Sequence, residues 1–171
     1  MDPFDSLVAR NAAFAADGFS STLRMLPSAR MMIIGCVDPR VDPIDILKLE
    51  PGEAAVIRNV GGRVNPALLE TFAMLRAVSL LAGQEVGAGW NLVVLQHTDC
   101  GIIGCHRHAP GLLAKYMGVP RDGLDSLAIE SSFTTLSLFV EAFDIRSTKA
   151  FADSIASTIS LLQLVANSSP C

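Results

Sequence analysis

The sequence has few basic residues, and they do not cluster. Its 13 lysines and arginines are scattered along 171 residues, the formal net charge is −4 and the pI is about 5.3. Binding to a phosphate backbone depends on a concentrated positive surface. The lack of such a surface argues against nucleic acid as a partner.

Long uninterrupted apolar runs and an export signal are also missing. The two most apolar segments, residues 68–83 and 159–166, are either interrupted by charges or far shorter than the ~20 residues that cross a bilayer. The N-terminus opens with acidic residues and lacks the basic stretch and apolar stretch of a secretory signal. These features predict no membrane span and a cytoplasmic location.

Charged residues make up only 18% of the chain, whereas half of its residues are hydrophobic. A chain of this length suits one domain, and we expect residues 1–171 to form it, with a helical arm at 1–25 and a tail at 150–171. The apolar content exceeds what a small monomer normally hides. The excess predicts a subunit interface.

Apolar runs alternate with helical patterns along the chain. Short continuous apolar runs are typical of parallel strands that are covered on both faces. Strands are expected at residues 30–38, 54–60 and 91–97, and helices at residues 3–17, 41–50, 65–83, 109–118 and 124–143. This order predicts an α/β fold with a parallel sheet, in which sites gather at the carboxyl ends of the strands.

Cysteine is scarce, but two of the four cysteines follow expected strands. Cys36 ends the first strand, and His97 and Cys100 leave the third in an H-x-x-C arrangement. If the two strands are neighbours, two thiolates and one imidazole converge, which suits zinc and leaves the fourth tetrahedral position open. Without an export signal, a metal site is a better explanation for these thiols than disulfides.

Asp38 and Arg40 follow Cys36 at alternate positions, in `MMIIGCVDPR`. Zinc can lower the pKa of a bound water to about 7 and so provide hydroxide at neutral pH. We expect Asp38 to accept the hydrogen of this hydroxide and aim its lone pair, and Arg40 to clamp Asp38 by a bidentate pair.

These motifs together resemble the β-class carbonic anhydrases, whose signature is Cys-x-Asp-Ser-Arg followed later by His-x-x-Cys. The segment `VIRNVGGRV` is similar to the Arg-Asn-Ala-Gly-Gly segment of that family, and the resemblance covers roughly residues 1–120. It implies a mostly four-stranded parallel sheet flanked by helices, one zinc per chain held by Cys36, His97 and Cys100, and a homodimer or homotetramer. It also implies a pocket at the subunit interface, for which we consider Val60, Gly61 and Gly62 candidates.

The sequence departs from the family pattern in three places. Pro39 replaces the serine of the signature, and Val60 replaces the alanine beside the glycines. Residues 147–171 lack the pattern of the family's closing strand and are typical of a serine-rich helix, so they do not predict the family's C-terminal edge strand. Cys105, His106 and His108 form a second tempting cluster, but we expect them in a polar segment without a fixed scaffold.

The resemblance implies zinc-dependent hydration of carbon dioxide to bicarbonate by a zinc-bound hydroxide. One alternative keeps the site and changes the gas: a carbonyl sulfide or carbon disulfide hydrolase would use the same hydroxide and release hydrogen sulfide. A second alternative is a catalytically inactive zinc-binding homologue, which the altered C-terminus favours. The retained Asp38 and Arg40 argue against it, since a closed structural site normally takes four protein ligands.

Overall fold

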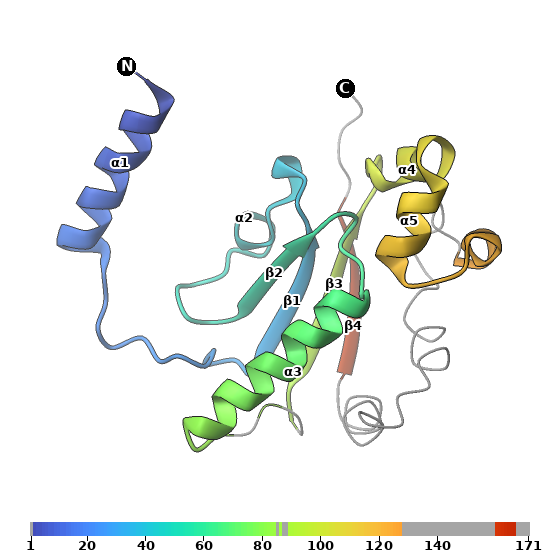
Figure 1. The fold of residues 1–171 in the computed structure, drawn as a ribbon. Helices are drawn as coiled ribbons and strands as arrows, with labels where there is room; N and C mark the ends of the chain where they lie inside the picture. The colour runs from blue at the N-terminus through green and yellow to red at the C-terminus, as the bar shows by residue number, and fades with distance from the viewer. Residues whose placement is uncertain (1, 85, 87–88, 128–159, 167–171) are drawn as a thin grey trace.

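A parallel four-stranded sheet forms the centre of the computed structural model (Figure 1), which describes residues 2–84, 86, 89–127 and 160–166. The strands are β1 (Met31–Cys36), β2 (Ala55–Asn59), β3 (Asn91–His97) and β4 (Ser160–Ala166). Their order across the sheet is β2-β1-β3-β4, and every neighbouring pair is parallel. The expected α/β fold with a parallel sheet is therefore confirmed.

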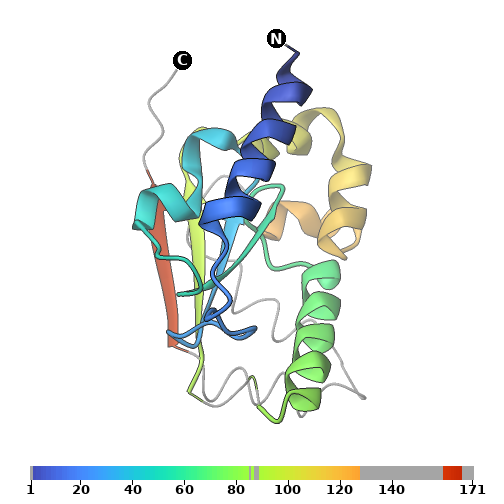
Figure 2. The same cartoon turned by 90° about the vertical axis from the view of Figure 1, so that its left-hand side faces the viewer.

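The helices differ in how they meet the sheet (Figures 1 and 2). The α-helices are α1 (Pro3–Ala13), α2 (Pro43–Leu47), α3 (Pro66–Leu81), α4 (Ile102–His108) and α5 (Pro110–Met117). Helix α3 crosses one face of the sheet, α4 and α5 lie beyond the carboxyl end of β3, and α1 stands apart from the sheet. No helix among the described residues has the length and apolar character to cross a membrane.

Two groups of buried side chains make up the core of the described residues. One lies between α3 and the sheet, where Leu68 and Phe72 pack with Ile34 and Val94. The other lies beneath α4 and α5 and includes Cys36, Cys100, Ile102, Leu113 and Met117. Because the carboxyl ends of β1 and β3 meet this second group, their thiols are enclosed by packed side chains.

The expected helix in the C-terminal tail is wrong over residues 160–166. These residues form β4, which pairs with β3 in register from Asn91↔Ser160 to His97↔Ala166. A short apolar run can form either a helix or a strand. Pairing with the open edge of β3 decides the outcome here, because it satisfies backbone groups that an edge strand leaves exposed.

One further expectation about local structure needs correction, and another falls largely on residues outside the described part of the chain. Cys105, His106 and His108 lie on α4, not in a segment without a scaffold. Of the helix expected at 124–143, the first residues belong to a 3-10 helix, Arg121–Leu127, and residues 128–143 lie outside the described part. The sequence did not predict α4 because glycines at 101 and 104, which disfavour helices, interrupt its hydrophobic pattern.

Candidate metal site

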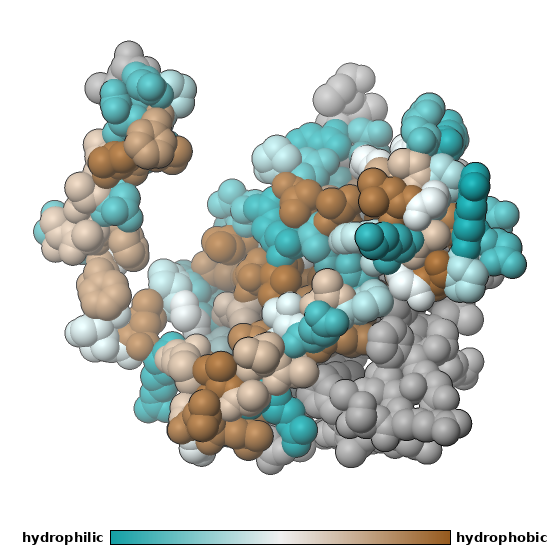
Figure 3. Space-filling model, viewed as in Figure 1, coloured by the Kyte–Doolittle hydropathy of each residue, from teal (hydrophilic) through white to brown (hydrophobic). Residues whose placement is uncertain are grey.

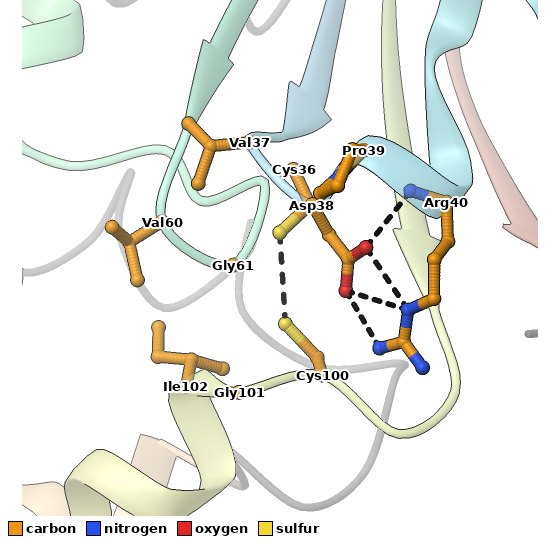
Figure 4. A pocket seen from close by; sticks show the side chains of 10 residues that line it. All are labelled: Cys36, Val37, Asp38, Pro39, Arg40, Val60, Gly61, Cys100, Gly101 and Ile102. Atoms are coloured by element: carbon orange, nitrogen blue, oxygen red, sulfur yellow. Dashed lines mark hydrogen bonds and ion pairs between the residues drawn. The ribbon is translucent and has the colours of Figure 1, made fainter. Parts of the chain in front are cut away.

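Side chains from the ends of β1 and β3 meet beneath α4. Ligand atoms of Cys36, His97 and Cys100 all lie within 4.8 Å of one another. The two Sγ atoms are 3.8 Å apart, far longer than the ~2.05 Å of a disulfide. A tetrahedral ion with Zn–S bonds of ~2.3 Å would hold two sulfurs about 3.8 Å apart. The two sulfurs are thus spaced as two ligands of one zinc ion should be, and they face each other across the site in Figure 4.

The orientation of His97 completes this donor set. Its Nδ1 lies 2.8 Å from the carbonyl oxygen of Thr98, which can only accept, so Nδ1 carries the proton. Nε2 is then a bare acceptor, and it is buried without a hydrogen-bond partner among the described residues. A buried lone pair costs free energy unless it accepts a hydrogen bond or coordinates a metal. Coordination of a metal by Nε2 would satisfy it.

Two thiols and one imidazole fit zinc, and no fourth His, Cys or carboxylate of the described residues joins the cluster. Burial, with a smaller contribution from the neighbouring Cys36 thiol, raises the pKa of the Cys100 thiol to about 11. Without metal, Cys100 therefore stays protonated near neutral pH. Metal binding has to displace that proton, so affinity should increase with pH.

Asp38 and Arg40 form a closed pair beside this cluster. Arg40 donates from Nε to Asp38 Oδ1 at 3.0 Å and from Nη2 to Oδ2 at 2.6 Å, and its backbone N–H donates to Oδ1 at 2.9 Å. The Arg40 guanidinium holds the pKa of the Asp38 carboxyl well below its usual range. Asp38 is therefore an ionised acceptor with a fixed orientation.

Arg40 also joins the two strand exits to each other. Its Nη1 donates to Asp99 Oδ2 at 3.0 Å, and its Nη2 donates to the Asp99 carbonyl oxygen at 3.1 Å. Asp99 lies in the turn between His97 and Cys100, with a left-handed φ of 54°. One guanidinium thus connects the carboxylate that follows β1 to the turn that carries two candidate ligands.

Arg58 supports the same loop from β2, and reasoning from the sequence overlooked it. Its Nε donates to the Cys36 carbonyl oxygen and its Nη2 to the Asp38 carbonyl oxygen, both at 2.8 Å. Its Nη1 pairs with Asp42, whose carboxylate also accepts from the Ile44 N–H and caps α2. The parallel register that sets Gly35 beside Arg58 brings these groups together.

A pocket of about 450 Å³ opens beside the thiols (Figure 4). Its lining residues are Cys36, Val37, Asp38, Pro39, Arg40, Val60, Gly61, Cys100, Gly101 and Ile102. Val37, Val60 and Ile102 form an apolar side, and the Asp38–Arg40 pair lies on the opposite side of the sulfurs. The structure thus brings candidates Val60 and Gly61 to the pocket, whereas Gly62 does not line it.

Gly62 has a different task, because it lets a loop approach the ends of two strands. Its φ is +58°, and a Cβ there would lie 2.8 Å from the Leu95 carbonyl oxygen and 3.2 Å from the Cys36 backbone nitrogen. Backbone atoms of a central sheet cannot move aside easily. Asn59 closes this loop by accepting from the Arg63 N–H and donating to the Arg63 carbonyl oxygen.

Gly62→Ala should lower the free energy of unfolding by about 1–3 kcal/mol, because it adds left-handed strain to the backbone collision. The matched control is Gly104→Ala, inside α4, where an added Cβ meets nothing within 4 Å. That change should increase stability by about 0.5–1 kcal/mol. Urea unfolding of both variants measures the difference, and equal stability of the two would contradict this role of Gly62.

Comparisons with known proteins agree with this geometry. The carbonic anhydrase family model matches residues 31–128, which is more than half of the chain. Beta-carbonic anhydrase 1 of Mycobacterium tuberculosis is 35% identical over 99 residues, covering 58% of this chain and 55% of that protein. The chain belongs to the β-carbonic anhydrase family.

The chain is also similar to a carbon disulfide hydrolase and to a carbonic anhydrase of known structure. The carbon disulfide hydrolase of Saccharolobus solfataricus is 30% identical to this β-carbonic anhydrase family member over 87 residues, covering 51% of the chain and 37% of that enzyme. The chain thus spans about half or less of the length of these curated relatives. A carbonic anhydrase from Streptococcus mutans shares the fold, with a TM-score of 0.57 at 23% identity over 96% of this chain and 93% of its own.

Proposed function

We propose that this chain catalyses the reversible hydration of carbon dioxide to bicarbonate, with one zinc ion held by Cys36, His97 and Cys100. The observation that carries the proposal is the donor set: two thiol sulfurs 3.8 Å apart that line an open pocket, and a buried imidazole nitrogen with no hydrogen-bond partner among the described residues. When bound, zinc would act as a Lewis acid that provides a hydroxide-strength nucleophile from water at neutral pH.

The residues around the donor set supply orientation. The Asp38 carboxylate lines the pocket and is ionised, so it can accept the O–H of a water molecule there and direct the oxygen lone pair. Arg40 holds Asp38 through two side-chain donors, which removes the carboxylate's freedom to rotate. A reacting group that is already aligned needs no reorganisation when the substrate arrives.

The pocket suits a small uncharged gas. Val37, Val60 and Ile102 offer an apolar surface that carbon dioxide can enter without losing hydrogen bonds to water. Bicarbonate, in contrast, is an anion that the apolar side would not retain. This difference favours entry of the substrate and departure of the product.

Stopped-flow hydration of carbon dioxide, followed with a pH indicator, tests the proposal. Protein loaded with one zinc per chain should accelerate hydration, and removal of the metal with a chelator should abolish the acceleration until zinc is restored. Stoichiometric zinc without any acceleration over buffer would refute the proposed activity. It would favour the inactive zinc-binding homologue.

Carbonyl sulfide or carbon disulfide hydrolysis is the second candidate. The 30% identity to a carbon disulfide hydrolase favours it, and so does Val60 at the pocket, where added bulk can change which gas enters. Parallel assays on one preparation separate the candidates, because only the sulfur-containing substrates release hydrogen sulfide. The larger kcat/KM identifies the preferred substrate.

We also propose that the chain acts as a homodimer or homotetramer, with α1 packed on another subunit. Helix α1 has no buried residue, and its apolar side chains are exposed in Figure 3. Phe4 is 68% exposed and Leu7 55% exposed, at a spacing that sets them on one side of the helix. Water contact over such a surface is costly, and a second copy would remove it.

The variant Phe4→Ser/Leu7→Ser should weaken this association and lower the mass measured by light scattering, in the simplest case to that of a single chain. Because no residue of α1 is buried in the described structure, the variant should keep the fold and the circular dichroism spectrum of the wild type. Arg10→Gln on the same helix is the control and should leave the mass unchanged. An unaltered mass in the double variant would exclude α1 as the interface.

A further inference from the structure

A second hollow lies at the opposite end of the sheet from the thiols. Arg30 directly precedes β1 and Trp90 directly precedes β3, so both mark the amino ends of central strands, at the lower end of the sheet in Figure 1. The hollow measures about 570 Å³, within the ~300–1,000 Å³ range of pockets for small molecules. It shares no lining residue with the pocket beside Cys36.

The polar side chains that line this hollow can all donate hydrogen bonds, and none of its described lining residues carries a carboxylate. Arg24 and Arg30 contribute two guanidinium groups, and Ser28 and Gln84 add a hydroxyl and an amide. Neither arginine has a hydrogen bond or ion pair through its side chain in the described part of the chain. In a protein of net charge −4, two cations in one hollow that have no ion-pair partner among the described residues create a local attraction for an anion.

The backbone around these donors is fixed. The Asn91 N–H donates to the Arg30 carbonyl oxygen at 2.9 Å, and the Ser28 N–H donates to the Gly52 carbonyl oxygen at 2.9 Å. Trp90, only 5% exposed, belongs to the core between the sheet and α3 and closes one side of the hollow. Arg30 and Ser28 therefore stand on hydrogen-bonded backbone, which lowers the entropy cost of binding.

We propose that this hollow binds the phosphate group of a small molecule. Planar guanidinium groups match the oxygens of a phosphate in pairs, which a single ammonium cannot do. The space exceeds that of one phosphate ion, so a phosphate ester fits better than the free ion. Nothing in this proposal depends on the chemistry at Cys36.

Equilibrium dialysis with inorganic phosphate and, separately, glycerol 3-phosphate tests the site at constant ionic strength. Binding of either probe supports the site, and tighter binding of the ester identifies a larger natural ligand. Trp90 is the single tryptophan of the chain, so its fluorescence reports whether a bound probe lies in this hollow. Retention of neither probe overturns the proposal.

The variant Arg24→Gln/Arg30→Gln should lower the affinity at least tenfold, and Ser28→Asp should do the same by adding a negative charge. All three positions are exposed, so the fold should persist. Arg121→Gln, an exposed arginine far along the chain, should bind within about twofold of wild type. Equal affinity of the double variant and the wild type would place the anion elsewhere and refute this site. Carbon dioxide hydration should be unchanged in the double variant, which separates this test from that of the proposed function.

Discussion

Cys100→Ser should abolish both zinc retention and carbon dioxide hydration. Serine keeps the shape of the side chain but replaces a soft thiolate, whose affinity for zinc is high, by a hydroxyl that does not ionise near neutral pH. Altering even a residue behind a metal ligand costs 10–100-fold in affinity or activity. Loss of a ligand should therefore lower hydration more than about 100-fold.

Two measurements separate loss of metal from loss of fold. Metal analysis after a chelator challenge should find about one zinc per chain in the wild type and almost none in the variant. Cobalt substitution adds a spectroscopic test, because thiolate-to-cobalt absorption should weaken when one of two sulfurs is removed.

Cys105→Ser is the matched control for this experiment. Cys105 is a partly buried thiol on α4 that packs against the same core, but it lies outside the Cys36–His97–Cys100 cluster. It should retain zinc and activity. If Cys100→Ser kept its zinc and its hydration rate, the proposed donor set would be wrong.

The convergence of this donor set could be predicted from the sequence for a simple reason. Buried parallel strands appear as continuous apolar runs, and their carboxyl ends lie on one edge of the sheet. Cys36 and His97 are the last residues of β1 and β3, so adjacency of the two strands was enough to bring them together. The Asp38–Arg40 pair was expected from alternate positions on an extended segment, but residues Pro39–Val41 form a 3-10 helix, and Asp38 meets Arg40 by capping its first turn.

The supports of the site depend on tertiary structure and were harder to foresee. Arg58 reaches the loop after β1 only because β1 and β2 pair in one particular register, which no local pattern specifies. The bond from Arg40 to Asp99 joins residues 59 positions apart. The sequence offered two signals for these supports: Arg58 within `VIRNVGG`, and Asp99 between the candidate ligands His97 and Cys100. Neither is specific, because such residues also occur in ordinary loops.

Strand β4 is an element that the local sequence pattern predicted wrongly. Its apolar run is seven residues long and fits a helix as well as a strand when it is considered alone. What selects the strand is the unpaired edge of β3, a partner more than sixty residues earlier in the chain. Local propensity therefore indicated the wrong element where long-range pairing supplied the larger free energy.

Arg40→Gln should lower the hydration rate about 100-fold while leaving zinc in place. The variant removes both side-chain donors to Asp38 and both contacts to Asp99, so the carboxylate loses its fixed direction. Positioned proton acceptors typically contribute 10²–10⁴-fold to rates. Arg40→Lys keeps the charge but offers no planar fork, so its rate should fall between those of the wild type and Arg40→Gln.

Asp99→Asn provides the control, because it leaves the Asp38–Arg40 pair intact and should cost less than about tenfold. The pH dependence of stability gives a second, independent readout. Arg40 lowers the pKa of Asp38 in the folded protein, so the pair adds stability above the ordinary carboxyl pKa of about 3.9 and loses it as the pH falls further. The difference in unfolding free energy between wild type and Arg40→Gln should therefore shrink from pH 6 to pH 3. A constant difference over that range, together with an unchanged hydration rate, would show that Arg40 neither holds Asp38 nor serves the reaction.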